Sequence, residues 1–265
     1  MADLRDWAVA EAMREVAAQV IMPRFQRLAD HEIDEKEPGD LVTVVDKQSE
    51  ARLTRALMAI EPGSRVVGEE AVAANPSLLG TIGDGLVWIV DPLDGTANYA
   101  AGEAPFAVMV ALARDGVVEA GWILDPVSPR MLHAVKGEGA FVDGVRIRSH
   151  GSGLPMPVAA LATRFLPLGV RETFETRSLG HLAPVPIPGC AGEQYPRVGL
   201  GVNDVALFWR SLPWDHAPGA LWLEEAGGKV ARLDGRPYRV TETGEGLLAA
   251  ATPELWDKAA AILVG

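Results

Sequence analysis

Two aspartates three residues apart, Asp91 and Asp94, stand in the segment WIVDPLDGTANY (Trp88–Tyr99). A run rich in β-forming residues ends there, and carboxylates at the end of a strand converge on one point. Carboxylate oxygens and a backbone carbonyl, in this case that of Leu93, are the ligands that hard divalent cations prefer. The segment therefore predicts a cation site, although Asp, Pro and Gly are also the residues of an ordinary turn.

The residues that follow Asp94 could hold an anion beside such cations. Gly95 lets the backbone approach a ligand closely, so the amides of Gly95 and Thr96 could donate to a phosphate oxygen. Divalent ions promote the hydrolysis of phosphate monoesters because they activate water and neutralise the leaving oxygen. The uncatalysed reaction is extremely slow, so such a site must lower the barrier by something on the order of 20 kcal/mol or more.

Further acidic residues end three other predicted elements, in the segments DLVTVVD (Asp40–Asp46), GEE (Gly68–Glu70) and WD (Trp214–Asp215). Taken singly, Glu69 and Glu70 are more often solvated surface charges. Asp46 and Asp215 are, by the same reasoning, more often helix caps. Brought together without cations these carboxylates would repel one another strongly, so the set predicts an ion-dependent site.

In these blocks and in their order, the sequence resembles the inositol monophosphatase family of lithium-sensitive, magnesium-dependent phosphatases. The resemblance extends from the first predicted helix to Ala251 and includes the longer blocks Gly121–Gly144 and Trp214–Gly228. Several matched blocks are far more specific than any single motif. The resemblance implies Mg²⁺-dependent hydrolysis of a small phosphate monoester, either inositol 1-phosphate or a related sugar or polyol phosphate.

The resemblance also implies two or three Mg²⁺ ions on one set of ligands: Glu69, Asp91, the Leu93 carbonyl, Asp94 and Asp215. Asp91 would be shared by the first two ions, and Asp46 and Glu69 would lie beside a weaker third. Glu69 and Thr96 would orient and deprotonate the attacking water, with Thr96 hydrogen-bonded to Asp46. The substrate pocket that the resemblance implies consists of Asp94, Gly95, Thr96, Ala191, Phe208 and Asp215.

One position in this pocket departs from the family pattern. Inositol-hydrolysing members place a glutamate that binds the sugar hydroxyls where this sequence has Phe208. Glu193 or Arg210 could compensate, or the pocket could prefer a less hydroxylated leaving group. Histidinol phosphate and adenosine 3′,5′-bisphosphate are the alternative substrates, and a noncatalytic regulatory protein is the alternative from another class. His216 is more simply a residue at a helix start than a catalytic base.

Composition narrows the range of partners and compartments. The formal net charge of −12 argues against a nucleic acid or an anionic membrane as the main partner. The single cysteine, Cys190, cannot form an intrachain disulfide, which fits a reducing compartment. No stretch approaches the ~20 apolar residues of a membrane span. We therefore expect a soluble cytoplasmic protein, and the resemblance implies a homodimer.

The elements that would position these residues divide into two groups. Apolar residues at helical spacing predict a helix from Leu4 to Ile21, and Asp46 could cap a second helix that ends at Glu61. Between them, the polar segment Asp30–Asp40 predicts an exposed loop. Runs of β-forming residues then predict an antiparallel sheet flanked by the helices: Arg65–Val67, Leu86–Val90, Phe106–Ala113, Val117–Leu124, Met131–Val135 and Ala140–Val142.

From about Leu154 onward, strand and helix candidates alternate, which favours an α/β arrangement. They are Val158–Thr163, Val170–Gly180, Val185–Ile187, Ala191–Leu200, Val205–Phe208, His216–Ala226, Val230–Leu233, Leu247–Ala251 and Pro253–Leu263. The stretch Ser149–Pro157 is the candidate boundary. We expect an α+β half (residues 1–150) with most metal ligands and an α/β half (151–265) with Asp215 and the specificity region. The resemblance implies that together they form a layered αβαβα sandwich.

Overall fold

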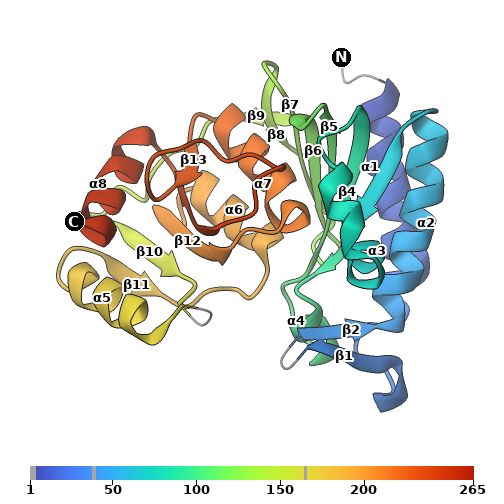
Figure 1. Ribbon diagram of the computed structural model, residues 1–265, viewed down its shortest axis with the longest axis horizontal. Coiled ribbons are helices and arrows are strands. Elements are labelled where there is room, and N and C mark those ends of the chain that lie inside the picture. Colours follow the sequence, from blue (N-terminus) through green and yellow to red (C-terminus); the bar gives the residue numbers. More distant parts are fainter. Residues whose placement is uncertain (1–3, 38–39, 164–165) are drawn as a thin grey trace.

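The computed structural model describes residues 4–37, 40–163 and 166–265. The first described element is α1 (Leu4–Val16), which continues through one π-helical turn (Ala17–Ile21). This turn and α2 (Val44–Ile60) complete a helical layer on one face of the larger sheet (Figure 1). Met13 of α1 and Leu53 of α2 are fully buried, as the helical spacing of apolar residues predicts, whereas Leu4 and Trp7, the first residues of that pattern, are exposed.

The polar segment that was expected to be an exposed loop contains a strand. A short 3₁₀ turn (Asp30–Glu32) leads into β1 (Ile33–Glu37), which pairs antiparallel with β2 (Asp40–Thr43). The two strands satisfy each other's backbone groups. A polar ribbon of this kind lacks the alternation of apolar residues that marks a half-buried strand, and the sequence therefore gave no signal of it.

Within the described residues, seven strands form the larger sheet, in the spatial order β3 (Arg65–Gly68), β4 (Leu86–Asp94), β5 (Ala107–Arg114), β6 (Val117–Asp125), β7 (Arg130–Val135), β8 (Gly139–Val142) and β9 (Val145–Ile147). Neighbouring strands are antiparallel except β3 and β4, which are parallel. The six predicted strands are confirmed, and β9 extends the sheet. Two short helical segments connect β3 to β4: α3 (Glu69–Ala74) and a 3₁₀ segment (Pro76–Thr81).

In the part of the chain that the structure describes, the second sheet has five strands, in the order β11 (Ala183–Val185), β10 (Val158–Leu161), β12 (Val205–Arg210), β14 (Glu245–Ala250) and β13 (Lys229–Arg232). β10 is parallel to both of its neighbours, whereas β14 is antiparallel to β12 and β13. The helices of this half are α5 (Leu168–Ser178), α6 (Ala191–Gly199), α7 (Pro213–Glu225) and α8 (Pro253–Val264). The predicted alternation is confirmed.

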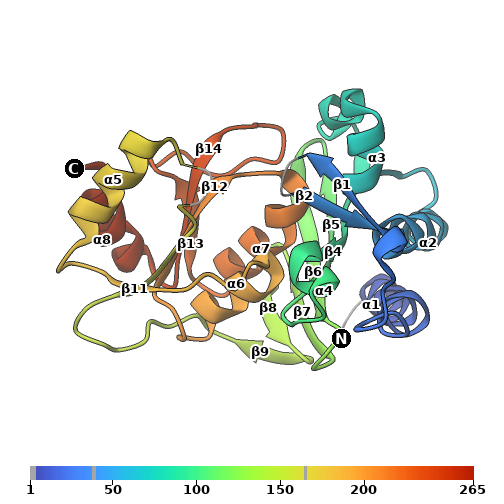
Figure 2. The same ribbon diagram turned by 90° about the horizontal axis from the view of Figure 1, so that it is seen from below.

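Helices and sheets alternate in five layers across the molecule. From one side to the other they are α1 with α2, the seven-stranded sheet, α6 with α7, the five-stranded sheet, and α5 with α8 (Figures 1 and 2). The central helices share one hydrophobic cluster with both sheets, which includes Met109 of β5, Trp222 of α7 and Leu247 of β14. The layered αβαβα sandwich is therefore confirmed.

Close packing in the central layer depends on small residues. A Cβ atom added to Gly219 of α7 would lie 2.1 Å from the Tyr195 ring of α6. Trp222 of α7 also donates from Nε1 to the carbonyl of Phe141 in β8, at 3.0 Å. The helix α7, which carries Asp215, is thus fixed against the larger sheet and against α6.

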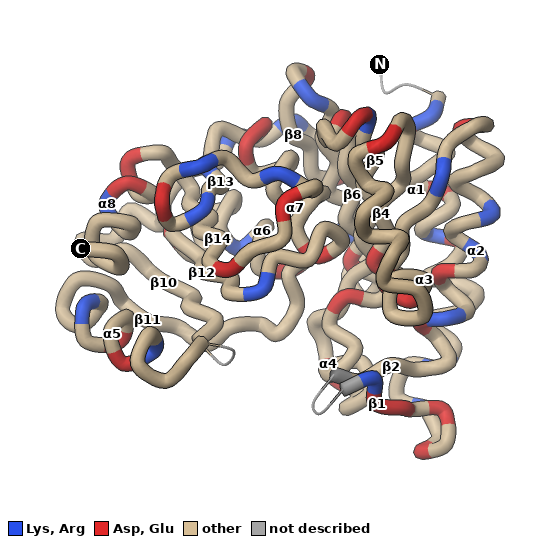
Figure 3. The backbone as a smooth tube through the Cα atoms, viewed as in Figure 1, with Lys and Arg blue, Asp and Glu red and all other residues tan. Residues whose placement is uncertain are grey.

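Charged residues are distributed over both halves of the fold. Figure 3 shows Lys and Arg scattered among Asp and Glu along the described backbone, with no single basic stripe. None of the helices in the described ranges has the length and apolar character needed to cross a bilayer.

Candidate active site

A cavity of about 360 Å³ lies between the two halves of the fold. It is lined by nine of the residues predicted to bind metal or substrate: Glu69, Asp91, Leu93, Asp94, Gly95, Thr96, Ala191, Phe208 and Asp215. Arg210, which was considered as a substitute for the missing glutamate, lines it as well. They come from α3, the end of β4, the start of α4 (Thr96–Ala100), α6, β12 and α7. Segments more than a hundred residues apart in the sequence thus meet at one place.

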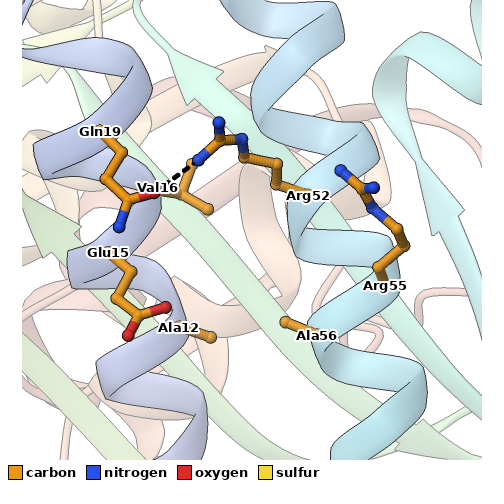
Figure 4. A pocket seen from close by; sticks show the side chains of 7 residues that line it. All are labelled: Ala12, Glu15, Val16, Gln19, Arg52, Arg55 and Ala56. Atoms are coloured by element: carbon orange, nitrogen blue, oxygen red, sulfur yellow. Dashed lines mark hydrogen bonds between the residues drawn. The ribbon is translucent and has the colours of Figure 1, made fainter.

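A second hollow, of about 420 Å³, lies between α1 and α2 on the outer face of the helical layer (Figure 4). Its lining includes Glu15, Arg55 and Arg52, and Arg52 donates to Gln19 at 2.7 Å. None of the residues predicted to bind metal or substrate lines this hollow. We therefore take the cavity between the two halves as the candidate active site.

Glu69, Asp91, Asp94 and Asp215 are called the carboxylate cluster below. Asp91 is only 2% exposed, and burial raises its pKa well above the ordinary value. The nearby charges of Glu69, Asp94 and Asp215 raise it further. An ionised carboxylate in this position is unfavourable by itself, and a bound cation would offset both the burial and the repulsion.

The cluster offers only oxygen donors, which suit a hard cation such as Mg²⁺. In the described residues, no group of three or more His, Cys, Asp or Glu side chains is already arranged to hold a metal ion. Protein donors occupy several of the oxygens. Asp94 Oδ2 accepts from Gly192 N at 2.6 Å and from Cys190 Sγ at 3.0 Å, and Asp91 Oδ1 accepts from Leu93 N at 2.9 Å. The donor chemistry fits the ion, and binding it would exchange some of these hydrogen bonds for metal contacts.

Lys36 of β1 is a neighbour of the cluster that the sequence did not reveal. Its Nζ donates to Glu69 Oε1 at 2.8 Å and to Glu70 Oε1 at 2.6 Å. Burial raises the pKa of Glu70 to about 7, although Lys36 acts in the opposite direction. Lys36 belongs to the segment expected to be a loop, and no motif around it indicates a contact with residues 33 and 34 positions away.

Asp46 is fixed beside Thr96 by the first turn of α2. Thr43, and not Asp46 as predicted, is the N-cap residue, and Asp46 Oδ2 accepts from Thr43 N at 2.8 Å and from its hydroxyl at 2.6 Å. This reciprocal arrangement is a capping box, in which the third helical residue bonds back to the cap. Asp46 Oδ1 lies 2.9 Å from Thr96 Oγ1, as does the Leu93 carbonyl, so the single hydroxyl proton serves one of them at a time.

Gly95 makes the turn from β4 into α4 with φ of +88°, a conformation that other residues rarely adopt. An added Cβ would also lie 3.1 Å from both Cys190 Cβ and the Pro105 carbonyl. The turn therefore requires glycine for two independent reasons. As a result, the backbone of Gly95 and Thr96 lines the cavity beside Asp94.

Tyr195, Phe208 and His216 are called the aromatic wall below. The Tyr195 and Phe208 rings stack at 5.2 Å, and His216 meets Phe208 edge-on at 4.7 Å. His216 Nε2 lies 3.0 Å from the Arg210 carbonyl, which can only accept, so Nε2 carries the hydrogen and Nδ1 accepts from the Tyr195 hydroxyl at 3.0 Å. Burial lowers the pKa of His216 to about 4. His216 is therefore neutral at pH 7 and acts as a packing residue.

Two polar residues near the aromatic wall have different surroundings. Glu193 is held by Arg130 at 2.6 Å and by Arg197 at 2.8 Å, and it is not among the described lining residues. Gln194 does line the cavity, is 3% exposed, and has no hydrogen-bond partner for either side-chain polar atom. The sequence analysis overlooked Gln194, although its position three residues after Ala191 places both on one face of a helix.

The sequence of nearly the whole chain can be compared with that of known proteins. A sequence profile of the inositol monophosphatase family matches residues 3–264. The chain belongs to this family. It is accordingly a phosphatase that hydrolyses phosphate monoesters.

Two relatives and one solved structure illustrate the range of the family. The chain is 34% identical over 233 residues to an inositol-1-monophosphatase of Mycobacterium leprae, which covers 85% of this chain and 79% of the relative. It is 33% identical over 236 residues to a histidinol-phosphatase of Mycobacterium tuberculosis, with 87% and 88% covered. The structure of an inositol monophosphatase from Anabaena superposes with a TM-score of 0.79 at 25% identity and covers 98% of this chain and 94% of its own.

Proposed function

We propose that the protein hydrolyses a small phosphate monoester with the help of two or three Mg²⁺ ions held by the carboxylate cluster and the Leu93 carbonyl. The observation that carries this proposal is the convergence of Glu69, Asp91, Asp94 and Asp215 on one cavity. The raised pKa of Asp91, caused first by burial and then by repulsion from the other carboxylates, supports it. When bound, the ions would supply the charge that activates water and stabilises the transferred phosphoryl group.

The chain's own groups would bind the ester and orient the water. The backbone amides of Gly95 and Thr96 would donate to phosphate oxygens. The Thr96 hydroxyl, oriented by Asp46, would hold the attacking water, and Glu69 would accept a proton from it once released from Lys36. As the water oxygen bonds to phosphorus, the bond from phosphorus to the ester oxygen breaks and the alcohol leaves with a proton.

Inositol 1-phosphate or a related sugar or polyol phosphate is the substrate class that the family resemblance implies. Histidinol phosphate is a second candidate, because Phe208 lines the cavity where a polyol-binding glutamate is expected. Adenosine 3′,5′-bisphosphate is the remaining alternative. A homodimer, a cytoplasmic location and inhibition by Li⁺ are further predictions, which light scattering, cell fractionation and a Li⁺ titration would test.

The decisive experiment measures phosphate release by the purified protein with and without Mg²⁺. The esters are inositol 1-phosphate, histidinol phosphate, fructose 1,6-bisphosphate and adenosine 3′,5′-bisphosphate, and Asp91→Asn is the control. We expect Mg²⁺-dependent release that the variant lacks. Metal-independent release, or full activity in the variant, would contradict the proposal.

A further inference from the structure

Asp215 lies in the first turn of α7, so its position depends on how the start of that helix is held. Leu212 occupies the N-cap position, and its side chain makes no capping hydrogen bond. A helix start that lacks a side-chain cap is less firmly fixed than a capped one. Contacts from outside the helix are therefore needed to fix the first turn and, with it, the Asp215 carboxylate.

Arg232 of β13 supplies such a contact to the connection between β12 and α7. Its Nη1 donates to Ser211 Oγ at 2.7 Å, and its Nη2 donates to the Glu242 carbonyl at 2.8 Å. Ser211 Oγ in turn donates to the Gly244 carbonyl. Arg232 and Ser211 are each only 5% exposed. One buried guanidinium thus joins the β12–α7 connection to the connection between β13 and β14.

The guanidinium of Arg232 is closely surrounded. A Cβ atom added to Gly244 would lie 3.3 Å from Arg232 Nη1, and the Tyr238 ring has its centroid 5.8 Å from Arg232 Cζ. Tyr238 belongs to the connection between β13 and β14, which runs beside α7 (Figure 1), and it meets His216 edge-on at 6.3 Å. The residue that follows Asp215 is therefore packed against the same group of side chains.

The charge of Arg232 adds to the effect of these contacts. Its hydrogen bonds to Ser211 and Glu242 go to neutral oxygens, which satisfy the donors but leave the charge in place. Burial first, and then the charge of Asp215, raise the pKa of Tyr238, whereas Arg232 acts in the opposite direction. Tyr238 thus lies near both charges. Attraction between Arg232 and Asp215 favours the same arrangement as the hydrogen bonds.

We propose that Arg232 is a positioning residue for Asp215, the metal ligand that the second half of the chain supplies. By fixing Ser211 and the start of α7, Arg232 keeps the Asp215 carboxylate in the cavity beside the other members of the carboxylate cluster. The inference rests on the proposed function, because it concerns a ligand of the proposed metal site.

The test measures Mg²⁺ binding by calorimetry in the absence of substrate, and Asp215→Asn identifies the binding step that depends on Asp215. Arg232→Met removes the donors at nearly constant length, and Ser211→Ala removes the other end of the same contact. We expect each variant to weaken that step about tenfold. Because both changes break one link, the double variant should also lose only about tenfold.

Leu263→Ala is the control for a general loss of stability. Leu263 is fully buried in α8, on the other side of the five-stranded sheet from α7. We expect this variant to melt at a lower temperature and to bind Mg²⁺ as the wild type does. In phosphate-release assays, excess Mg²⁺ should restore kcat of Arg232→Met to near the wild-type value, because the Asp215 carboxylate itself is retained.

Amide hydrogen exchange of the metal-free protein gives a readout that depends on neither Mg²⁺ nor hydrolysis. We expect residues 214–217 to exchange about tenfold faster in Arg232→Met and in Ser211→Ala than in the wild type, because the first turn of α7 opens more often. Exchange of the same residues in Leu263→Ala should match that of the wild type.

The outcomes distinguish this inference from the proposed function. Wild-type Mg²⁺ affinity in Arg232→Met, an equal loss in Leu263→Ala, or losses that multiply in the double variant overturn the inference and leave the proposed function intact. If the wild type binds no Mg²⁺, the proposed function is overturned and hydrogen exchange alone decides the inference. Faster exchange in both variants then supports the role of Arg232 at the start of α7, and unchanged exchange overturns it.

Discussion

At the scale of single residues, the site brings together several negative charges, and their repulsion must be offset by positive charge. Asp91 is the most buried member of the carboxylate cluster, and three other carboxylates act on it. Lys36 provides a positive charge to Glu69, at 2.8 Å. The remaining repulsion is a cost to folding that a bound cation would remove.

Removal of the Asp91 charge should therefore have opposite effects on stability and activity. We expect Asp91→Asn to raise the melting temperature of the metal-free protein by about 2–4 °C, which corresponds to about 1 kcal/mol for a chain of this size. The same variant should lose more than about 100-fold in Mg²⁺-dependent activity. Calorimetry in EDTA and a phosphate-release assay measure the two effects. Asp84→Asn, at an exposed position, is the control, and a lower melting temperature for Asp91→Asn would contradict the prediction.

His216 should make stability depend on pH. Its pKa is about 4 in the folded protein and near 6.5 in the unfolded chain. As pH falls from 6.5 to 4, the unfolded chain binds a proton that the folded protein does not, so this residue lowers the free energy of unfolding by about 1.4 kcal/mol per pH unit. His216→Gln should reduce that slope in urea unfolding series between pH 4.5 and 6.5. An unchanged slope, or an equal reduction in the exposed control His150→Gln, would argue against it.

At the scale of elements, the short helix α3 holds Glu69 in place with help from α2. Glu50 of α2 is buried and accepts from Glu70 N and Ala71 N, both at 2.8 Å. These are two of the backbone amides that a helix start leaves unpaired. The approach is so close that a Cβ on Gly68 would lie 2.3 Å from Glu50 Oε2. Glu50 is therefore a positioning residue for the start of α3.

Loss of the Glu50 carboxylate should disturb both folding and metal response. We expect Glu50→Ala to lower the free energy of unfolding by about 1–3 kcal/mol, because two partly buried amides lose their acceptor. It should also raise the Mg²⁺ concentration needed for half-maximal activity several-fold, because Glu69 begins the helix that Glu50 holds. Urea unfolding and Mg²⁺ titrations measure these effects, with exposed Glu172→Ala as the control. A destabilised variant with a normal Mg²⁺ requirement would show that Glu50 does not position Glu69.

At the scale of the whole molecule, α6 and α7 join the two sheets and complete the cavity. Residues of both halves share one hydrophobic cluster, and Trp222 is almost completely buried in it. The connection between β9 and β10, over residues 149–157, contains no helix or strand. The chain thus changes from one sheet to the other where a boundary was predicted, while the core continues across it.

The shared core predicts that the halves 1–150 and 151–265 unfold together. We expect one calorimetric transition, and a loss of about 3–5 kcal/mol in Trp222→Ala, because truncation leaves a cavity between α7 and the larger sheet. Val264→Ala, at a half-exposed position near the C-terminus, is the control. Two separate transitions, or a stable isolated fragment 1–150, would show that the halves fold as independent domains.

Much of the element pattern was readable from local sequence. The strands around Val110 and Ile123 are continuous runs of β-forming residues, because both faces of the sheet are buried there. The helices around Leu53 and Ala259 follow the helical period of apolar residues, because one face of each is buried. Asp91 and Asp94 were also recognisable, since their spacing and the glycine after them constrain one turn. The polar strand β1 and the capping role of Thr43 were missed, because their stability comes from hydrogen bonds that leave no apolar pattern.

Only the tertiary structure decided which distant residues meet. The contact of Lys36 with Glu69, the contact of Glu50 with α3, and the presence of Gln194 and Phe208 in the lining of one cavity all depend on how sheets and helices pack. Local sequence reports backbone conformation and which face is buried, whereas the distance between two side chains on different elements is set by the packing of whole layers. The sequence by itself determined the elements and the acidic chemistry, and the packing of the layers determined the shape and the polarity of the cavity in which that chemistry would act.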